Sequence, residues 1–227
     1  MLDFPKLLGA CAELSEWFPD GLVYIGGIAT YLHAINGKGM QALAETTHDA
    51  DFYISRVDIM ELREIENLVQ NRRLSKQQLI KRGFEFDVYV EKESNLRVPY
   101  ADLVADSVSY DGVRVASLEH LIVLKLLAYQ DRRGSDKGEK DARDIVRLAL
   151  LLNERTTPAN HEGIAIHLSD DETDLLRAVR NSEAALIMAK GNAKLAKSYR
   201  TVLDGLIESL DAFRLEPAAT TKKQRKP

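Results

Sequence analysis

The sequence predicts an α/β (α+β) fold, in which a small mixed sheet is followed by a C-terminal bundle of helices. Three observations lead to this prediction. Short runs rich in β-forming residues alternate with helical patterns up to about residue 116. Beyond Ser117, which suits a helix N-cap, only helical patterns follow. The chain has 227 residues, of which 45% are hydrophobic and 29% charged, as is typical of a globular protein with a buried core.

The first half of the chain alternates helices and strands. Apolar residues at helical spacing predict helices, and short apolar or alternating runs predict strands. Gly26-Gly27 lies between the first strand and the next helix, and residues 36–48 have no clear period, so they predict a loop. In chain order we expect a helix at 2–18, a strand at 22–25, a helix at 28–35, a strand at 50–54, a helix at 58–71 and a strand at 84–90.

Two hairpins complete the first half. Asp111-Gly112 suits a two-residue turn that needs positive φ, and it predicts a hairpin over residues 107–116. The segment from Gln77 to Arg82 fits either a helix closed by Gly83 or one arm of a hairpin that turns at Gly83, and we favour the hairpin.

The second half contains only helical patterns, at 118–130, 139–152, 171–190 and 192–213. We therefore expect a core at 1–116, a helical domain at 117–215 and a basic tail at 216–227. The tail contains no large apolar residue, so it should be disordered.

Charge and cysteine content exclude several classes of protein. With 31 Lys and Arg against 35 Asp and Glu, the net charge of −4 argues against a protein that coats nucleic acid. Cys11 is the single cysteine, which excludes an internal disulfide and a cysteine zinc cluster and fits a reducing compartment. Because no run of eighteen apolar residues occurs, we expect no membrane span and a cytoplasmic protein.

Carboxylates recur on two of the predicted strands. Asp49 and Asp51 are two residues apart, so the pleat directs both to one face, and Asp87 lies on the polar side of the strand at 84–90. Three such oxygen donors could hold two hard cations and so activate an attacking oxygen and a leaving phosphate. The alternative is an acidic strand edge that faces water.

Positive or anion-binding groups accompany these carboxylates. Gly26-Gly27 would let backbone N–H groups and a helix N-terminus approach a phosphate, although the pair could also be an ordinary tight turn. Lys125 interrupts an apolar helical run, so it either extends its ammonium to solvent or points into a cleft. The basic stretch around Arg132, with Arg133, Lys137 and Lys140, could bind a triphosphate or RNA, or could be a solvated loop.

Together these residues resemble a known family. Ile25-Gly26-Gly27, Thr47-His48-Asp49-Ala50-Asp51 and Phe86-Asp87-Val88 resemble the DNA-polymerase-β-like nucleotidyltransferase superfamily, whose pattern is a glycine turn, a paired Asp and a later single Asp. The stretches Ser117–Lys125, Asp131-Arg132 and Lys140–Asp144 are similar to abortive-infection nucleotidyltransferase toxins of bacterial toxin–antitoxin pairs.

The resemblance implies a role for each of these positions. Gly26 and Gly27 would bind the triphosphate of an NTP substrate, and Asp49 and Asp51 would hold Mg²⁺, with two ions expected. Asp87 would be the third acidic member, which could bind metal and accept the proton of the incoming hydroxyl. The remaining implied nucleotide-binding residues are Lys125, Arg132 and Asp141.

The implied reaction is magnesium-dependent transfer of a nucleoside monophosphate from an NTP to an acceptor hydroxyl, with RNA or protein favoured as acceptor and a cognate antitoxin as a further partner. One alternative is a module of the same fold that binds a nucleotide or a partner without turnover. Another is an enzyme that modifies a small molecule such as an antibiotic. The sequence leaves the base of the NTP, the acceptor and the oligomeric state open.

Overall fold

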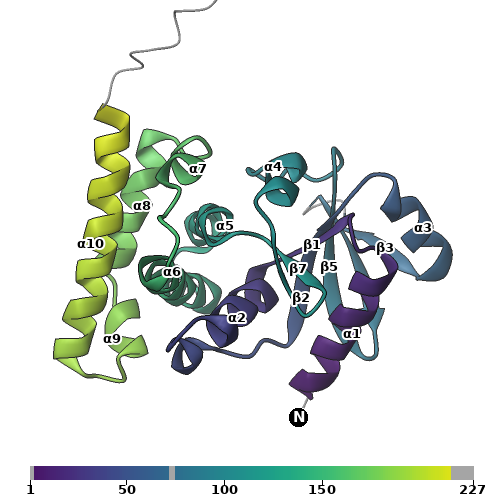
Figure 1. Ribbon diagram of the computed structural model, residues 1–227, viewed down its shortest axis with the longest axis horizontal. Coiled ribbons are helices and arrows are strands. Elements are labelled where there is room, and N and C mark those ends of the chain that lie inside the picture. The colour runs from purple at the N-terminus through teal and green to yellow at the C-terminus, as the bar shows by residue number, and fades with distance from the viewer. Residues whose placement is uncertain (1–2, 72–74, 216–227) are drawn as a thin grey trace, which may run out of the picture.

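The computed structural model describes residues 3–71 and 75–215, and Figure 1 labels its elements. The strands are β1 (Leu22–Ile25), β2 (Asp49–Ile54), β3 (Leu68–Asn71), β4 (Lys76–Lys81), β5 (Phe84–Val90), β6 (Val108–Tyr110) and β7 (Val113–Val115). The helices are α1 (Phe4–Trp17), α2 (Gly26–Asn36), the 3₁₀ helix η1 (Gln41–Leu43), α3 (Asp58–Ile65), α4 (Tyr100–Ala105), α5 (Leu118–Arg132), α6 (Asp136–Glu154), α7 (His161–Ala165), α8 (Asp170–Arg180), α9 (Ala184–Met188) and α10 (Ala193–Leu215).

The strands form one mixed sheet in the order β3-β4-β5-β2-β1-β7-β6. β2 pairs with β5 in parallel and with β1 antiparallel, while β1 pairs with β7 in parallel. The remaining pairs, β3 with β4, β4 with β5 and β6 with β7, are antiparallel. The mixed sheet followed by helices confirms the predicted fold class.

Helix α2 joins the sheet to the helical part of the chain. It contacts β1 and β2 on one side and α5 and α6 on the other. Figure 1 accordingly shows α2 between the sheet, which lies with α1 and α3 at one end of the molecule, and α6, α8, α9 and α10 at the other. Ser117 caps α5 by accepting a hydrogen bond from the backbone N–H of His120, as expected of an N-cap serine.

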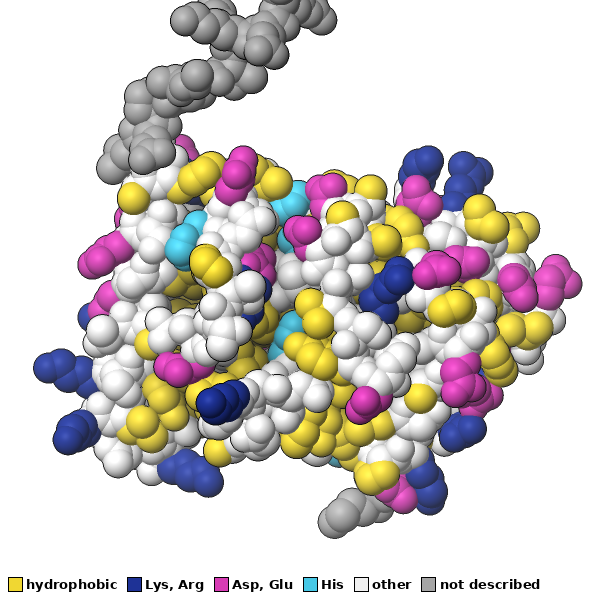
Figure 2. Space-filling model, viewed as in Figure 1, with side chains coloured by type: hydrophobic (Ala, Val, Ile, Leu, Met, Phe, Trp, Pro, Cys, Tyr) yellow, Lys and Arg dark blue, Asp and Glu magenta, His cyan; other side chains and the backbone are white. Residues whose placement is uncertain are grey.

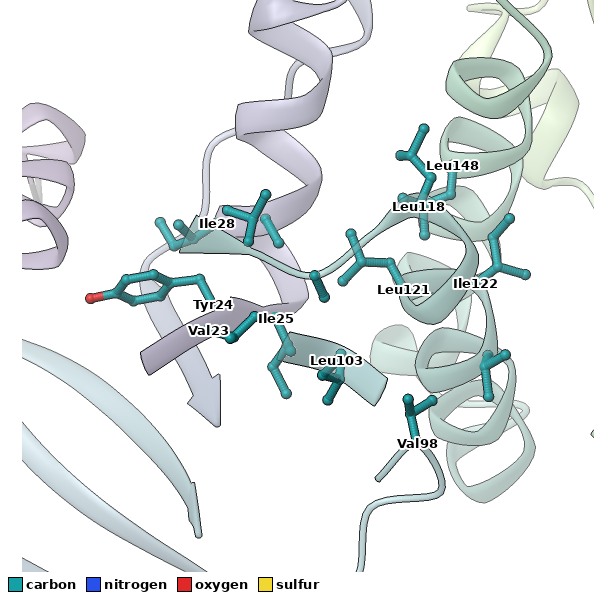
Figure 3. Close-up of a cluster of buried hydrophobic side chains, with 14 of the residues drawn as sticks. Val23, Tyr24, Ile25, Ile28, Val98, Leu103, Leu118, Leu121, Ile122 and Leu148 are labelled. Carbon is teal, nitrogen blue, oxygen red and sulfur yellow. The ribbon is translucent and has the colours of Figure 1, made fainter. Parts of the chain in front are cut away.

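A continuous apolar core runs across this junction (Figure 3). Val23 on β1, Leu103 on α4, Leu121 on α5 and Leu148 on α6 are all fully buried. Each such side chain contributes about 1.5–3 kcal/mol by leaving water. The change from strands to helices near residue 116 therefore lies within one hydrophobic core.

The structure corrects the helix predicted at 58–71. The helix ends at Ile65, Glu66 is extended at φ −131° and ψ 146°, and Leu68–Asn71 forms β3. The apolar spacing continues at helical period, but residues 68–71 pair antiparallel with β4 and extend the sheet. This long-range pairing outweighs the local pattern.

The segment that the sequence left open, 77–82, is a hairpin arm. β4 pairs antiparallel with β5 through a two-residue turn at Arg82 and Gly83, whose φ values are 52° and 83°. The hairpin predicted at 107–116 is also confirmed, as β6 and β7.

The helix expected at 171–190 is wrong as a single element, because it divides into α8 and α9 with a turn at Asn181 and Ser182. Two short helices, α4 and α7, were not predicted. The predicted tail at 216–227 lies outside the described residues. Among the helices of residues 3–71 and 75–215, none has the length and apolar character needed to cross a membrane.

Candidate active site

Three aspartates lie on one face of two neighbouring parallel strands. Asp51 on β2 is the register partner of Asp87 on β5, and Asp49 is the partner of Glu85. Because side chains alternate along a strand, Asp49, Asp51 and Asp87 face the same side, together with the exposed Glu85. The structure therefore brings together the three predicted carboxylates, and we refer to them as the acidic cluster.

Asp51 lies at the centre of the acidic cluster. Burial raises its pKa, and the neighbouring charges of Asp49 and Asp87 raise it further, to about 7. Lys125 and Lys76 act in the opposite direction on the pKa of Asp51 but do not cancel this rise. The cluster thus has an excess of negative charge that a cation would relieve.

The predicted glycine turn lies directly against Asp51. Gly26 has φ +65°, and a Cβ built on it would be 2.3 Å from Asp51 Oδ2. A Cβ on Gly27 would lie 3.0 Å from the side chain of Thr47, whose hydroxyl donates to Asp49 Oδ1 at 2.6 Å. Since α2 begins at Gly26, the free N–H groups of a helix N-terminus lie beside the carboxylates.

Asp87 already has two side-chain partners on the adjacent strand β4. The ammonium of Lys76 contacts Asp87 Oδ2, and Gln78 donates from Nε2 to Asp87 Oδ1 at 3.0 Å. Tyr89, two residues further along β5, has its pKa raised by burial and by Asp51 and Asp87. The prediction from sequence missed the roles of Thr47, Lys76, Gln78 and Tyr89, although the last shares the face of Asp87 by simple alternation.

The predicted cationic and acidic residues of α5 and α6 form a second charged group next to the first, largely buried except for Arg132, which is 42% exposed. Lys125 Nζ lies 2.7 Å from Asp144 and 3.1 Å from Asp141, and Arg132 lies 2.8 Å from Asp141. Arg147 pairs with Asp144 and Glu45, and its Nε donates to Leu43 O at 2.6 Å. We refer to Lys125, Arg132, Asp141, Asp144 and Arg147 as the ion-pair cluster.

The two clusters adjoin at Lys125. Burial lowers the pKa of Lys125, but Asp144, Asp141 and Asp51 outweigh burial and raise it to about 12. The side chain is 13% exposed. Lys125 is therefore held inside the protein near the acidic cluster and does not extend into solvent, whereas Arg133 and Lys137 are exposed.

The donor set suits a hard divalent cation at Asp49 and Asp51. Both supply carboxylate oxygens, which Mg²⁺ prefers. The glycine turn keeps the space over Asp51 free of Cβ atoms, and the excess negative charge favours a cation. Within the described ranges no group of three or more His, Cys, Asp or Glu side chains is arranged as a ready metal site, so Asp87 does not complete a closed set with the other two.

Comparisons with known proteins address the fold. No protein-family model matches the sequence, and no curated protein matches it significantly. Two solved structures from Helicobacter pylori each superpose with a TM-score of 0.50. JHP933 is 17% identical, with 94% of each chain covered, and a protein assigned as a nucleotidyltransferase is 14% identical, with 93% of this chain and 96% of that chain covered. The chain has a nucleotidyltransferase fold. At these identities the likeness is one of fold, and it agrees with the independent resemblance of the glycine turn and the paired Asp.

Proposed function

We propose that this protein is a magnesium-dependent nucleotidyltransferase that moves a nucleoside monophosphate from an NTP to an acceptor hydroxyl. The observation that supports this most is the position of Asp51, a half-buried carboxylate between two others and directly under the Gly26 turn. Excess carboxylate charge on one side and helix N–H groups on the other suit a cation bound to a polyphosphate. The nucleotidyltransferase fold is consistent with this arrangement.

Each residue has a role in this proposal. Asp49 and Asp51 hold Mg²⁺, which when bound neutralises phosphate charge and orients the reacting oxygens. Gly26 and Gly27 admit the triphosphate, and Lys125 and Arg132, positioned by Asp141, supply positive charge beside it. The acceptor oxygen forms a bond to the α-phosphorus, the bond from that phosphorus to the bridging oxygen breaks, pyrophosphate leaves with that electron pair, and the proton of the acceptor hydroxyl is released to solvent.

Asp87 is the third acidic member of the site. Both of its oxygens accept hydrogen bonds from side chains on β4, so neither oxygen can accept the hydroxyl proton without losing one of these contacts. We therefore propose that Asp87 chiefly positions the Lys76 ammonium. Asp87 can bind a metal ion only when Lys76 moves away from its carboxylate.

We propose RNA or a protein side chain as acceptor and a toxin role in a toxin–antitoxin pair, in the cytoplasm. The support is the resemblance of residues 117–144 to abortive-infection toxins and the exposed basic stretch that includes Arg133 and Lys137. On the face shown in Figure 2, acidic and basic side chains are interspersed without an extended basic patch, so a broad nucleic-acid surface is not present on that face.

The direct test is incorporation of label from each of four α-³²P-labelled NTPs with Mg²⁺, against total RNA, lysate protein and an aminoglycoside. We expect label in one acceptor class with the wild type, and a loss of roughly 10²–10³-fold or more in Asp51→Asn. Asp174→Asn on α8, whose carboxylate is 70% exposed, serves as a control that keeps full activity.

The main alternative is a module that binds nucleotide or a partner without turnover, and the occupation of Asp87 by Lys76 favours it. NTP binding without incorporation into any acceptor would support this alternative. Absence of NTP binding would exclude both functions.

A further inference from the structure

A lysine ammonium lies against the acidic cluster, in contact with Asp87. Lys76 extends from β4, its side chain is only 12% exposed, and its ammonium contacts Asp87 Oδ2. With Gln78 on the other oxygen, both oxygens of Asp87 are bound by side chains of this chain. The carboxylate therefore cannot ligate a metal without losing at least one of these contacts.

The sheet register fixes this arrangement. Gln78 is the antiparallel register partner of Asp87, and Asp87 is in turn the parallel partner of Asp51. Lys76 lies two residues before Gln78 on the same strand, so both side chains are on the face that bears the acidic cluster.

Lys76 brings positive charge to the face that bears the acidic cluster. Asp49, Asp51 and Asp87 lie on this face with Glu85, the register partner of Asp49, and the Lys76 ammonium contacts one of these carboxylates, Asp87. The ammonium therefore already supplies part of the charge that a second cation would bring. An ammonium is a compact point charge that can also bind phosphate, so it can take the place of an ion in such a site.

We propose that Lys76 takes the place of one of the two metal ions, and that the site binds a single divalent cation at Asp49 and Asp51. This inference rests on the proposed function. Asp87 then serves to position the Lys76 ammonium, with Gln78 fixing the other oxygen of the same carboxylate. The expectation of two ions, taken from the resemblance, is replaced by one ion and one lysine.

The test is the number of Mn²⁺ ions bound by the full-length protein, measured by electron paramagnetic resonance titration of free Mn²⁺. We expect one Mn²⁺ per chain in the wild type and two in Lys76→Met, which keeps the length of the side chain without its charge. Lys76→Arg keeps the charge and should bind one. Lys92→Met is the matched control, because Lys92 is 72% exposed beside Glu91 at the end of β5, and it should also bind one.

Each outcome bears on the inference. Two Mn²⁺ ions in the wild type, or two in Lys76→Arg, would overturn the role of Lys76 and leave the proposed function standing. One ion in a Lys76→Met protein with a wild-type circular dichroism spectrum would also overturn it. If the wild type binds no Mn²⁺, the metal site of the proposed function fails and the inference fails with it. Should Lys76→Met not fold, the wild type and Lys76→Arg still decide the question.

Discussion

The acidic cluster and the ion-pair cluster adjoin at Lys125, yet their charges are balanced differently. In the acidic cluster three carboxylates have one ammonium, that of Lys76. In the ion-pair cluster two carboxylates, Asp141 and Asp144, have three cationic partners. Burial acts in the same direction on the pKa of Asp51 and on that of Asp144, so the partners account for the difference.

The pKa values of two aspartates show this contrast. Burial raises the pKa of Asp51, and its carboxylate neighbours raise it further, to about 7. Burial also acts to raise the pKa of Asp144, but Lys125 and Arg147 outweigh it, and the pKa is lowered overall. The ion-pair cluster balances its charges within the protein and so fixes Lys125 and Arg132 beside the acidic cluster. The acidic cluster lacks positive charge, which a ligand can supply, and this marks it as the candidate binding site.

The largest effect that we expect is a loss of stability when a carboxylate of the ion-pair cluster is neutralised. Asp144→Asn leaves Lys125 and Arg147 buried with fewer partners, so the free energy of unfolding should fall by about 3 kcal/mol, the lower end for a broken buried ion pair. Urea denaturation at pH 7.5 measures this. Asp174→Asn, which removes an exposed pair with Arg177, should cost less than about 0.5 kcal/mol. Equal effects of the two substitutions would show that the ion-pair cluster is not structural.

The corresponding substitution in the acidic cluster should have the opposite sign. Asp51→Asn removes a buried charge between two like charges, and a pKa shift of one unit corresponds to about 1.4 kcal/mol. The amide has a desolvation cost of its own, so we expect a net gain of roughly 2 kcal/mol at pH 8 without divalent cations. In a chain of this size the melting temperature would rise by about 4–8 °C.

Differential scanning fluorimetry in EDTA tests this second prediction, and saturating Mn²⁺ should stabilise the wild type but not Asp51→Asn. A fall in the melting temperature of Asp51→Asn would mean that the Asp51 carboxylate is already satisfied within the protein.

The sequence predicted the positions of the carboxylates in the acidic cluster, but it did not predict every element of the fold. The alternation of Phe84–Val90 and the spacing of Asp49 and Asp51 placed three carboxylates on one face, and the strand register confirms it. That prediction succeeded because the pleat is a local property. The helix at 58–71 failed for the converse reason, since β3 exists only through its pairing with β4.

The contacts of charged side chains depend on the same long-range pairing. Lys76 and Gln78 reach Asp87 only because β4 and β5 form a hairpin, and the sequence left that segment open. Lys125 meets Asp141 and Asp144 because α5 packs on α6, which residue spacing along the chain does not specify. Motifs therefore identified the acidic residues, whereas their balance of charge required the fold.

A smaller effect on stability is expected at the glycine turn, where an added Cβ would meet the Asp51 carboxylate. Gly26→Ala and Gly83→Ala both place a Cβ at positive φ, which costs about 1 kcal/mol in each case. Gly83 has no neighbour within 4 Å of the added Cβ, whereas at Gly26 the Cβ would be 2.3 Å from Asp51 Oδ2. We expect Gly26→Ala to cost about 1 kcal/mol more than Gly83→Ala, and this excess should vanish in an Asp51→Ala background. A cycle of urea denaturation experiments measures the coupling, and an excess that persists without the Asp51 carboxylate would contradict the contact.

The smallest expected effect is the dependence of stability on pH, for which Asp51 and the buried histidines act with opposite sign. The pKa of Asp51 is raised to about 7 in the folded protein, so between pH 8 and 6.5 the folded state binds more protons than the unfolded state. Stability should therefore rise as the pH falls through 7, by about 0.8 kcal/mol over this interval.

The buried histidines act in the opposite direction. Burial lowers the pKa of His33, His120 and His167, so their contribution to stability is full above the unfolded pKa of about 6.5 and is lost as the pH falls below it. Melting temperatures of the wild type in EDTA should consequently pass through a maximum near pH 6.5, while Asp51→Asn should be flat from pH 8 to 6.5 and decline only below it. Parallel profiles for the two proteins between pH 8 and 6.5 would show that Asp51 does not titrate there, and would remove the distinction between an acidic cluster that lacks positive charge and an ion-pair cluster that is complete.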